Sequence, residues 1–256
     1  MATHFRGPLQ VARNTAGGLF DDAPIEVTRT RAGSCYFVDF LDINDFVLGT
    51  NWTGTETGTT ATAVVGTSGV CGELNLAAET DNEGYTPLQL GTTTAVSALV
   101  PADGTTLIYE ARVAHSNWSE GDWFIGFGEV DTTFMSAAGA LLANGADNHA
   151  GFHHVVADDA TFDLSMCGNA LASIQPSVTG TGTAAAALTD GQFYRFGIRV
   201  ENASWVRFYI DDIPVSAWTE LTADMDVAMT PTFCFIAEGV ALTMDIDYVL
   251  AAQTRV

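Results

Sequence analysis

One pair of carboxylates in this sequence has the residue types and spacing that catalysis would need. In the segment GDWFIGFGEVDTTF, residues 121–134, a strand-like run ends in Glu129, Val130 and Asp131. Side chains alternate between the two faces of a strand, so Glu129 and Asp131 would lie on one face. Two carboxyl groups about 5 Å apart can hydrolyse a glycosidic bond with retention, one as nucleophile and the other as acid. The spacing therefore raises glycoside hydrolysis as a first hypothesis.

The residues that follow Asp131 argue against this chemistry. The full strand pattern, Glu-hydrophobic-Asp-x-x-Glu, needs a further acid two or three residues after Asp131, where the sequence reads Thr-Thr-Phe. We therefore expect no hydrolysis and interpret the triplet as the end of a strand. Alternation places Glu129 on the face of Trp123, and a carboxylate beside aromatic rings can contact a sugar. Trp123, Glu129 and Asp131 are thus candidates for glycan binding.

Histidine and acidic residues lie close together in the sequence at residues 149–159, which raises the question of a metal site. His153 and His154 are adjacent on a predicted strand, so they face opposite sides and cannot share one metal. His149 lies upstream and Asp158 and Asp159 downstream, but their spacing matches no specific ligand set. We expect no metal in this segment.

A second place is the turn ETDNEG, residues 79–84, which offers oxygen atoms that suit calcium. Its candidate ligands are Glu79, Asp81, Asn82 and Glu83. The turn lacks the twelve-residue calcium-loop pattern, so we expect a solvated turn. No P-loop, Gly-x-Ser-x-Gly or Gly-x-Gly-x-x-Gly motif occurs either, and no cofactor is predicted.

The cysteines are far apart and show no Cys-x-x-Cys spacing, so zinc binding is not expected. They are Cys35, Cys71, Cys167 and Cys234. Cys35 and Cys234 lie inside apolar, strand-like runs. We expect reduced, buried thiols that pack as small hydrophobic groups. Disulfide bonds remain an alternative.

The charge of the chain restricts its partners. It has 31 Asp plus Glu against 9 basic residues, all of them Arg, which gives a formal net charge of −22. Such a charge opposes binding to nucleic acid and to anionic membranes, whereas it suits a basic protein surface. No window of eighteen apolar residues and no signal-peptide pattern is found, so neither membrane insertion nor secretion is expected.

The elements that would position these residues are short strands. From Cys35 onward, aromatic and β-branched runs alternate with Gly, Asn, Asp and Thr clusters, which is typical of an all-β chain. Ten strands are predicted, at residues 35–41, 60–66, 72–79, 107–114, 123–130, 151–157, 193–200, 205–211, 232–238 and 242–250.

Several of these strands have one apolar and one polar face. In FYRFGIRV, Phe196 and Ile198 point one way while Arg195 and Arg199 point the other. In LTMDIDYVL the predicted inward residues are Leu242, Met244, Ile246 and Tyr248. Two antiparallel sheets packed face to face would bury the apolar faces. The predicted organisation is an irregular arm over residues 1–34 and one antiparallel jelly-roll β-sandwich over residues 35–256.

Three segments carry a resemblance to a known family. They are LIYEARVAHSNWSEGDWFIGFGEVDTT, FYRFGIRVENASWVRFYIDDIPV and MTPTFCFIAEGVALTMDIDYVLAAQTR. The sequence there resembles tailed-phage virion proteins that have a concanavalin A-like lectin and glucanase jelly roll. The resemblance implies a capsid decoration, or cement, protein that stabilises the shell and has no enzymatic activity.

The same resemblance implies the partners and the location. They are the major capsid protein and further copies of this chain on the virion surface, after synthesis in the host cytoplasm. The arm, together with an edge or end of the sandwich, would make the contacts, and the apolar residues of the arm follow neither a helical nor a strand period, as expected for a segment ordered mainly by a partner. These predicted contact residues are Phe5, Leu9, Val11 and Phe20. The arm is expected to contribute little to the fold.

Two other functions remain open. A glycan-binding module, on the virion surface or a tail fibre, would use aromatic and Asp side chains of the concave sheet. Three tryptophans near predicted strand ends and loops either close the sandwich or form a platform for a sugar or a protein: Trp52, Trp118 and Trp218. A glycoside hydrolase is the third hypothesis.

Overall fold

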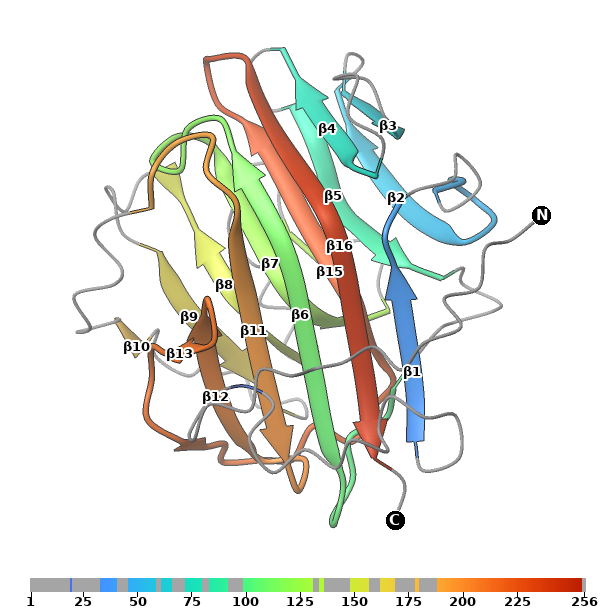
Figure 1. The fold of residues 1–256 in the computed structure, drawn as a ribbon, viewed down its shortest axis with the longest axis vertical. Helices are drawn as coiled ribbons and strands as arrows, with labels where there is room; N and C mark the ends of the chain where they lie inside the picture. The colour runs from blue at the N-terminus through green and yellow to red at the C-terminus, as the bar shows by residue number, and fades with distance from the viewer. Residues whose placement is uncertain are drawn as a thin grey trace.

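A computed structural model describes residues 19, 33–40, 46–58, 61–65, 72–79, 83–91, 99–130, 134–135, 148–156, 162–168, 178–179 and 188–254. In these residues the chain forms two antiparallel β-sheets that pack face to face (Figure 1). They contain no α-helix, and hence no helix that could cross a membrane. The predicted all-β antiparallel sandwich is confirmed.

The first sheet, sheet A, is built around its longest strand. Its strands are β1 (Gly33–Val38), β3 (Thr62–Val65), β4 (Leu74–Ala78), β6 (Thr106–His115), β11 (Tyr194–Glu201), β12 (Trp205–Ile210), β13 (Ile213–Pro214), β14 (Thr219–Glu220) and β16 (Leu242–Thr254). The order is β13-β12-β11-β6-β16-β4-β3, with β1 paired to β16 and β14 paired to β12. Strand β16 pairs with β6 on one side and with β4 and then β1 on the other.

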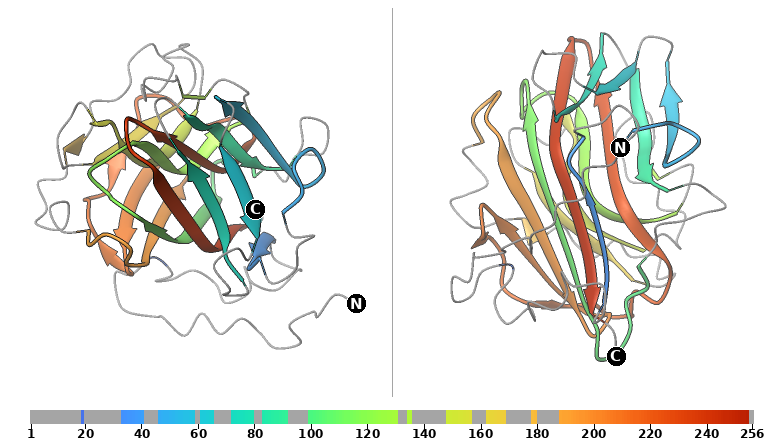
Figure 2. Two further views of the ribbon diagram at one scale, coloured as in Figure 1. Left: turned by 90° about the horizontal axis from the view of Figure 1, so that it is seen from above. Right: turned by 45° about the vertical axis from the view of Figure 1, so that its right-hand side comes forward.

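The second sheet, sheet B, forms the other layer, which Figure 2 shows from two further directions. Its strands are β2 (Trp52–Thr57), β5 (Glu83–Leu90), β7 (Asp122–Glu129), β8 (His149–His154), β9 (Asp163–Cys167), β10 (Val178–Thr179) and β15 (Met229–Ala237). The order is β10-β9-β8-β7-β15-β5-β2, and all pairs are antiparallel.

The core lies between the two sheets and is rich in aromatic rings. On β11 it contains Phe196 and Ile198, as predicted, together with Tyr194 and Val200. The ring of Phe152 on sheet B meets the rings of Phe196 and Phe208 on sheet A, with centroids 5.0 and 5.3 Å apart. Such edge-to-face contacts between the layers hold the sheets in a fixed relation.

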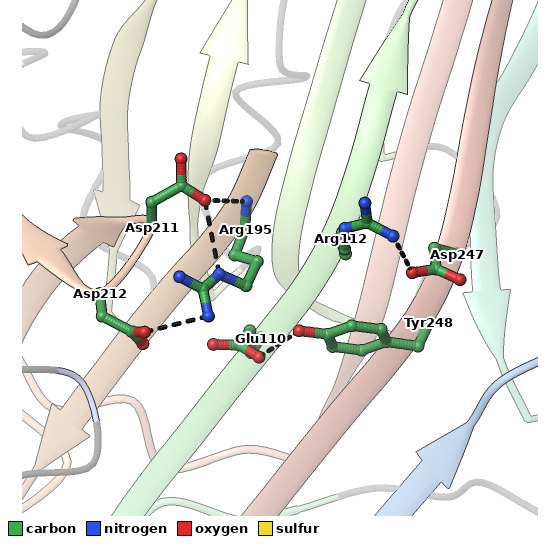
Figure 3. Close-up of polar contacts among 7 residues, drawn as sticks. All are labelled: Glu110, Arg112, Arg195, Asp211, Asp212, Asp247 and Tyr248. Carbon is green, nitrogen blue, oxygen red and sulfur yellow. Dashed lines mark hydrogen bonds and ion pairs between the residues drawn. The ribbon is translucent and has the colours of Figure 1, made fainter. Parts of the chain in front are cut away.

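One inward residue was predicted wrongly because β16 contains a β-bulge. The pairing with β6 shifts between Ile246 and Tyr248, so one extra residue interrupts the alternation. Val249 therefore enters the core, while the hydroxyl of Tyr248 donates to Glu110 on the outer face of sheet A (Figure 3).

The N-terminal segment contributes a buried side chain to sheet A. Leu19 is 1% exposed and packs with Ile108 and Tyr209 on the outer face. Gly197 makes room for it, because a Cβ at that position would lie 2.6 Å from Leu19 Cδ2. Strand β1 begins at Gly33, within the predicted arm. The four predicted contact residues of the arm, Phe5, Leu9, Val11 and Phe20, lie outside the described residues.

Candidate functional site

The structure does not bring the three predicted glycan-binding residues together on a surface. Trp123 is fully buried, with its ring stacked on His154 at a centroid distance of 5.5 Å. Glu129 is half-buried at the end of β7, where its Oε2 accepts hydrogen bonds from the backbone N–H and the side-chain amide of Asn148, each at 3.2 Å. Asp131 lies outside the described residues. Of the three residues, Glu129 alone is seen near solvent.

Phe134 stands where the hydrolase pattern would have its second glutamate, and it is buried. Its ring lies 4.8 Å from that of Phe124 and 5.8 Å from that of His149. Phe124 alternates with the core residues of β7, so this contact is on the face of sheet B that is turned away from sheet A. The apolar cluster on that face comprises Phe124, Phe134, Met135, Cys234 and Ile236. Apolar side chains thus cover the middle of the face.

The histidines take part in local hydrogen bonds. His149 Nε2 lies 2.8 Å from Ser165 Oγ, and His154 Nδ1 donates to the Gly121 carbonyl at 2.9 Å. No group of three or more His, Cys, Asp or Glu that could hold a metal occurs in the part of the chain that the structure describes. The candidate ligands Asp81, Asn82, Asp158 and Asp159 fall outside that part.

Two of the cysteines are described, and both are free thiols. Cys167 and Cys234 are buried, as predicted for Cys234. Burial raises the pKa of the Cys234 thiol well above its usual value, because the thiolate would lose its hydration. The side chains of Cys35 and Cys71 lie outside the description.

Every arginine that the structure describes lies on the outer face of sheet A. These are Arg112 on β6, Arg195 and Arg199 on β11, and Arg207 on β12, all alternating with core residues. The register places Arg112 opposite Arg195 and Arg199 opposite Arg207. Like charges directly opposite each other destabilise an antiparallel pair. Although the chain has only 9 basic residues against 31 acidic ones, four of its arginines form two pairs that lie directly opposite each other on neighbouring strands.

The first pair is balanced by carboxylates of the protein (Figure 3). Arg112 forms an ion pair with Asp247 at the bulge of β16. Arg195 lies 3.4 Å from Asp211 and 3.1 Å from Asp212, in the turn that follows β12. Three acidic groups therefore surround these two guanidinium groups.

In the second pair, the two arginines have different partners. Arg199 Nη2 lies 2.6 Å from Glu201 Oε1. Arg207 donates from Nε to the Ser216 carbonyl oxygen at 3.2 Å, and it forms no ion pair with a carboxylate of the described residues. The ring of Trp218 lies 5.8 Å from the Arg199 guanidinium and 5.9 Å from that of Arg207, within the range of cation–π contacts.

A second tryptophan lies beside this pair. Trp205 is 38% exposed and sits between Glu201 on β11 and Glu220 on β14. We call the group of Arg199, Glu201, Trp205, Arg207, Trp218 and Glu220 the arginine–aromatic patch. Below it, Tyr209 lies 5.6 Å from the Arg207 guanidinium. Burial raises the pKa of Tyr209, against the opposing effect of the Arg207 and Arg199 charges.

No protein-family model and no curated protein sequence matches the chain. Solved structures share its fold. A glycoside hydrolase family 16 endo-glucanase from Bacteroides ovatus is 13% identical with a TM-score of 0.56, over 84% of this chain and 98% of that one. The laminarinase catalytic domain of Thermotoga maritima is 12% identical with a TM-score of 0.55, over 88% of this chain and 100% of that one.

A third similar structure comes from a different class of protein. Botulinum neurotoxin type C, whose cell entry depends on interaction with two ganglioside molecules, is 8% identical with a TM-score of 0.51, over 86% of this chain and 47% of that one. The fold is a concanavalin A-like jelly roll. Identities this low establish the fold alone.

These structures correct the leading functional prediction. The sequence analysis expected a phage capsid decoration protein without enzymatic activity, yet none of the three similar structures is a capsid protein, and two are glucan-cleaving enzymes. Both parts of that prediction are therefore wrong. The strand segments that carried the resemblance encode the jelly roll itself, which is shared by proteins of unrelated function.

Proposed function

We propose that the chain recognises a carbohydrate through the arginine–aromatic patch of sheet A. The observation that carries the proposal is the exposed ring of Trp205 and the half-buried ring of Trp218 beside guanidinium and carboxylate groups. Sugar rings combine apolar faces with hydroxyl groups. Aromatic rings cover such apolar faces, while charged side chains form strong hydrogen bonds with hydroxyl groups.

The patch lies near one edge of sheet A and has polar groups on both sides of an aromatic ring. The edge strand is β13 (Figure 1), and β13 and β14 are each two residues long. Glu201 and Glu220 flank Trp205 on neighbouring strands, so polar groups stand on both sides of the ring. The similar structures support a carbohydrate ligand, since two act on glucans and the third interacts with gangliosides.

Calorimetric titration of gluco-oligosaccharides and acidic oligosaccharides against Trp205→Ala tests the proposal. Removing one stacked ring should weaken binding by roughly fivefold, since aromatic stacking contributes about 1 kcal/mol. Phe37→Ala is the matched control, because Phe37 is 39% exposed on the same sheet face, four strand spacings or roughly 19 Å away. Equal binding by wild type and Trp205→Ala, or no binding of any oligosaccharide, would reject the patch.

A second candidate function, hydrolysis, is favoured by the geometry at Glu129. Its carboxylate is fixed by two hydrogen bonds from Asn148 at the end of β7, in a fold that endo-glucanases also use. A retaining enzyme needs a positioned carboxylate nucleophile and a second carboxyl about 5 Å away. The next acid along the chain is Asp131.

Release of reducing sugar from β-1,3- and β-1,4-glucans tests this candidate. Turnover that disappears in Glu129→Gln but persists in Trp205→Ala would assign hydrolysis to the end of β7. No release from any substrate, with binding at the patch intact, would leave recognition as the function.

A further inference from the structure

We infer that Arg207 makes the arginine–aromatic patch selective for glycans that carry an anionic group, a carboxylate or a sulfate ester. This selectivity rests on the carbohydrate recognition proposed above for the same patch. It adds the chemical class of the ligand and the side chain that binds the anionic group.

The first argument is the charge balance of the two arginine pairs. They have the same layout, because each sets an arginine of β11 directly opposite an arginine of a neighbouring strand. At Arg112 and Arg195 the protein supplies three carboxylates, those of Asp211, Asp212 and Asp247. At the second pair, Arg199 forms an ion pair with Glu201, whereas Arg207 forms no ion pair with a carboxylate of the described residues. The Arg207 guanidinium is therefore the one that an anionic ligand can pair with.

The second argument is that Arg207 is already held in place. Its Nε–H donates to the Ser216 carbonyl, and its guanidinium contacts the rings of Tyr209 and Trp218 at 5.6 and 5.9 Å. A guanidinium group has five N–H donors in a planar fork that fits a carboxylate or sulfate in bidentate fashion. Because the side chain is ordered before binding, little conformational entropy is lost when the ligand arrives.

The third argument concerns the neighbours of Arg207. Trp218 contacts the guanidinium, and Trp205 is two residues away on the same face of β12. An anionic group bound to Arg207 would thus have aromatic surface beside it for the sugar ring that bears it. A free inorganic anion would leave that aromatic surface unused.

The net charge of −22 does not prevent such binding. At physiological ionic strength, exposed charges farther away than about 8 Å are largely screened. The charges within the patch therefore dominate once the ligand is in contact.

The experiment is calorimetric titration with three oligosaccharides of equal length: oligogalacturonate, a sulfated gluco-oligosaccharide and a neutral gluco-oligosaccharide. Each is titrated into wild type, Arg207→Gln, Arg207→Lys and Arg112→Gln. The last variant is the matched control, because Arg112 lies on the same face but is already paired with Asp247. Circular dichroism and thermal melts establish that each variant is folded.

Wild type should bind at least one acidic ligand about tenfold more tightly than the neutral one, and the two acidic arms separate carboxylate from sulfate. Arg207→Gln should lose about 10- to 100-fold for that acidic ligand, as expected for a charged hydrogen-bond donor. Arg207→Lys should recover part of this loss, since it keeps the charge without the fork. Arg112→Gln should stay within about threefold of wild type.

Three outcomes would overturn the inference. Neutral ligand bound as tightly as acidic ligand, or acidic binding unchanged in Arg207→Gln, rejects the selectivity while carbohydrate recognition stands. Equal losses in Arg207→Gln and Arg112→Gln would mean that binding follows the overall charge of the face. If none of the three oligosaccharides binds, the proposed function itself fails.

Discussion

The contact between Leu19 and Gly197 allows a direct test of how the N-terminal segment sits on the sandwich. Leu19 is buried over Gly197, between Ile108 and Tyr209. Two substitutions address this contact from opposite sides. Leu19→Ala removes the buried side chain, and Gly197→Ala inserts a methyl group beneath it.

The structure gives the magnitude of each effect. Leu19→Ala should cost about 2–3 kcal/mol of unfolding free energy, the lower part of the range for buried leucines, because Leu19 packs on the outside of one sheet. In wild type, a Cβ on residue 197 would lie 2.6 Å from Leu19 Cδ2, about 1 Å closer than a normal carbon contact. That overlap should cost about 1–2 kcal/mol, partly offset by about 0.5–1 kcal/mol because alanine suits a strand better than glycine.

The sign of the Gly197→Ala effect should therefore depend on Leu19. Without the leucine side chain, the nearest atom to the new Cβ is Tyr209 Cβ at 3.3 Å, which is tight but close to ordinary contact. Gly197→Ala should then be neutral or stabilise by about 0.5 kcal/mol. The expected coupling between the two substitutions is about 1–2 kcal/mol.

Urea unfolding of the four proteins measures this cycle, with tryptophan fluorescence and far-ultraviolet circular dichroism as independent probes. Coincident transitions establish that a single free energy describes each protein. Gly54→Ala, another strand glycine, on sheet B, is the control and should have the same effect with and without Leu19. If the effect of Gly197→Ala is also the same in both backgrounds, Leu19 does not lie over Gly197 in solution.

Three further predictions follow from buried or acidic groups. Burial lowers the pKa of His115 from 6.5 to about 4, so the unfolded chain binds the proton first, and stability should fall as the pH falls from about 6.5 to 4. Urea melts should show a loss of about 3 kcal/mol of unfolding free energy between about pH 6.5 and 4 in wild type, and no such loss in His115→Phe. A wild-type unfolding free energy that stays constant over this pH range would contradict the burial of neutral His115. Cys234, which is fully buried, should be alkylated by iodoacetamide only after denaturation, as read by peptide mass spectrometry; labelling of the native protein would show that the site opens. EDTA should leave the Tm within about 1 °C, since the described residues offer no metal-binding group, whereas a large drop would direct attention to residues 79–84.

Strands with clean alternation could be predicted from the sequence, and strands without it could not. All ten predicted runs contain observed strands, because β-branched and aromatic residues at every second position mark a half-buried strand. Strand β2, Trp52–Thr57, was missed because it is composed mainly of Thr and Gly at the edge of sheet B. Strand β5, Glu83–Leu90, was also missed. It contains Pro87, which has no N–H to donate to a neighbouring strand and lies at an irregularity in the pairing with β15.

The candidate site depended on information that alternation does not contain. The sequence placed Arg195 and Arg199 on an outer face, but not Arg199 opposite Arg207, because cross-strand register is set by the turn between β11 and β12. The face of Trp123 was predicted, but not its complete burial, to which Trp118, Phe162 and Phe196 contribute. Trp218 was noted as a platform candidate, but its two guanidinium neighbours come from β11 and β12.

The central position of β16 has a consequence for how the molecule is made. This strand is the last along the described chain, yet it joins β6 to β4 and β1 in the middle of sheet A. On a translating ribosome, β4 and β6 must wait with open edges until residues 242–254 have emerged. Open strand edges pair readily with other nascent chains, so this stage of synthesis is the one most exposed to aggregation. Chaperone binding before that point should therefore raise the yield of folded protein, whereas slower translation there should lower it.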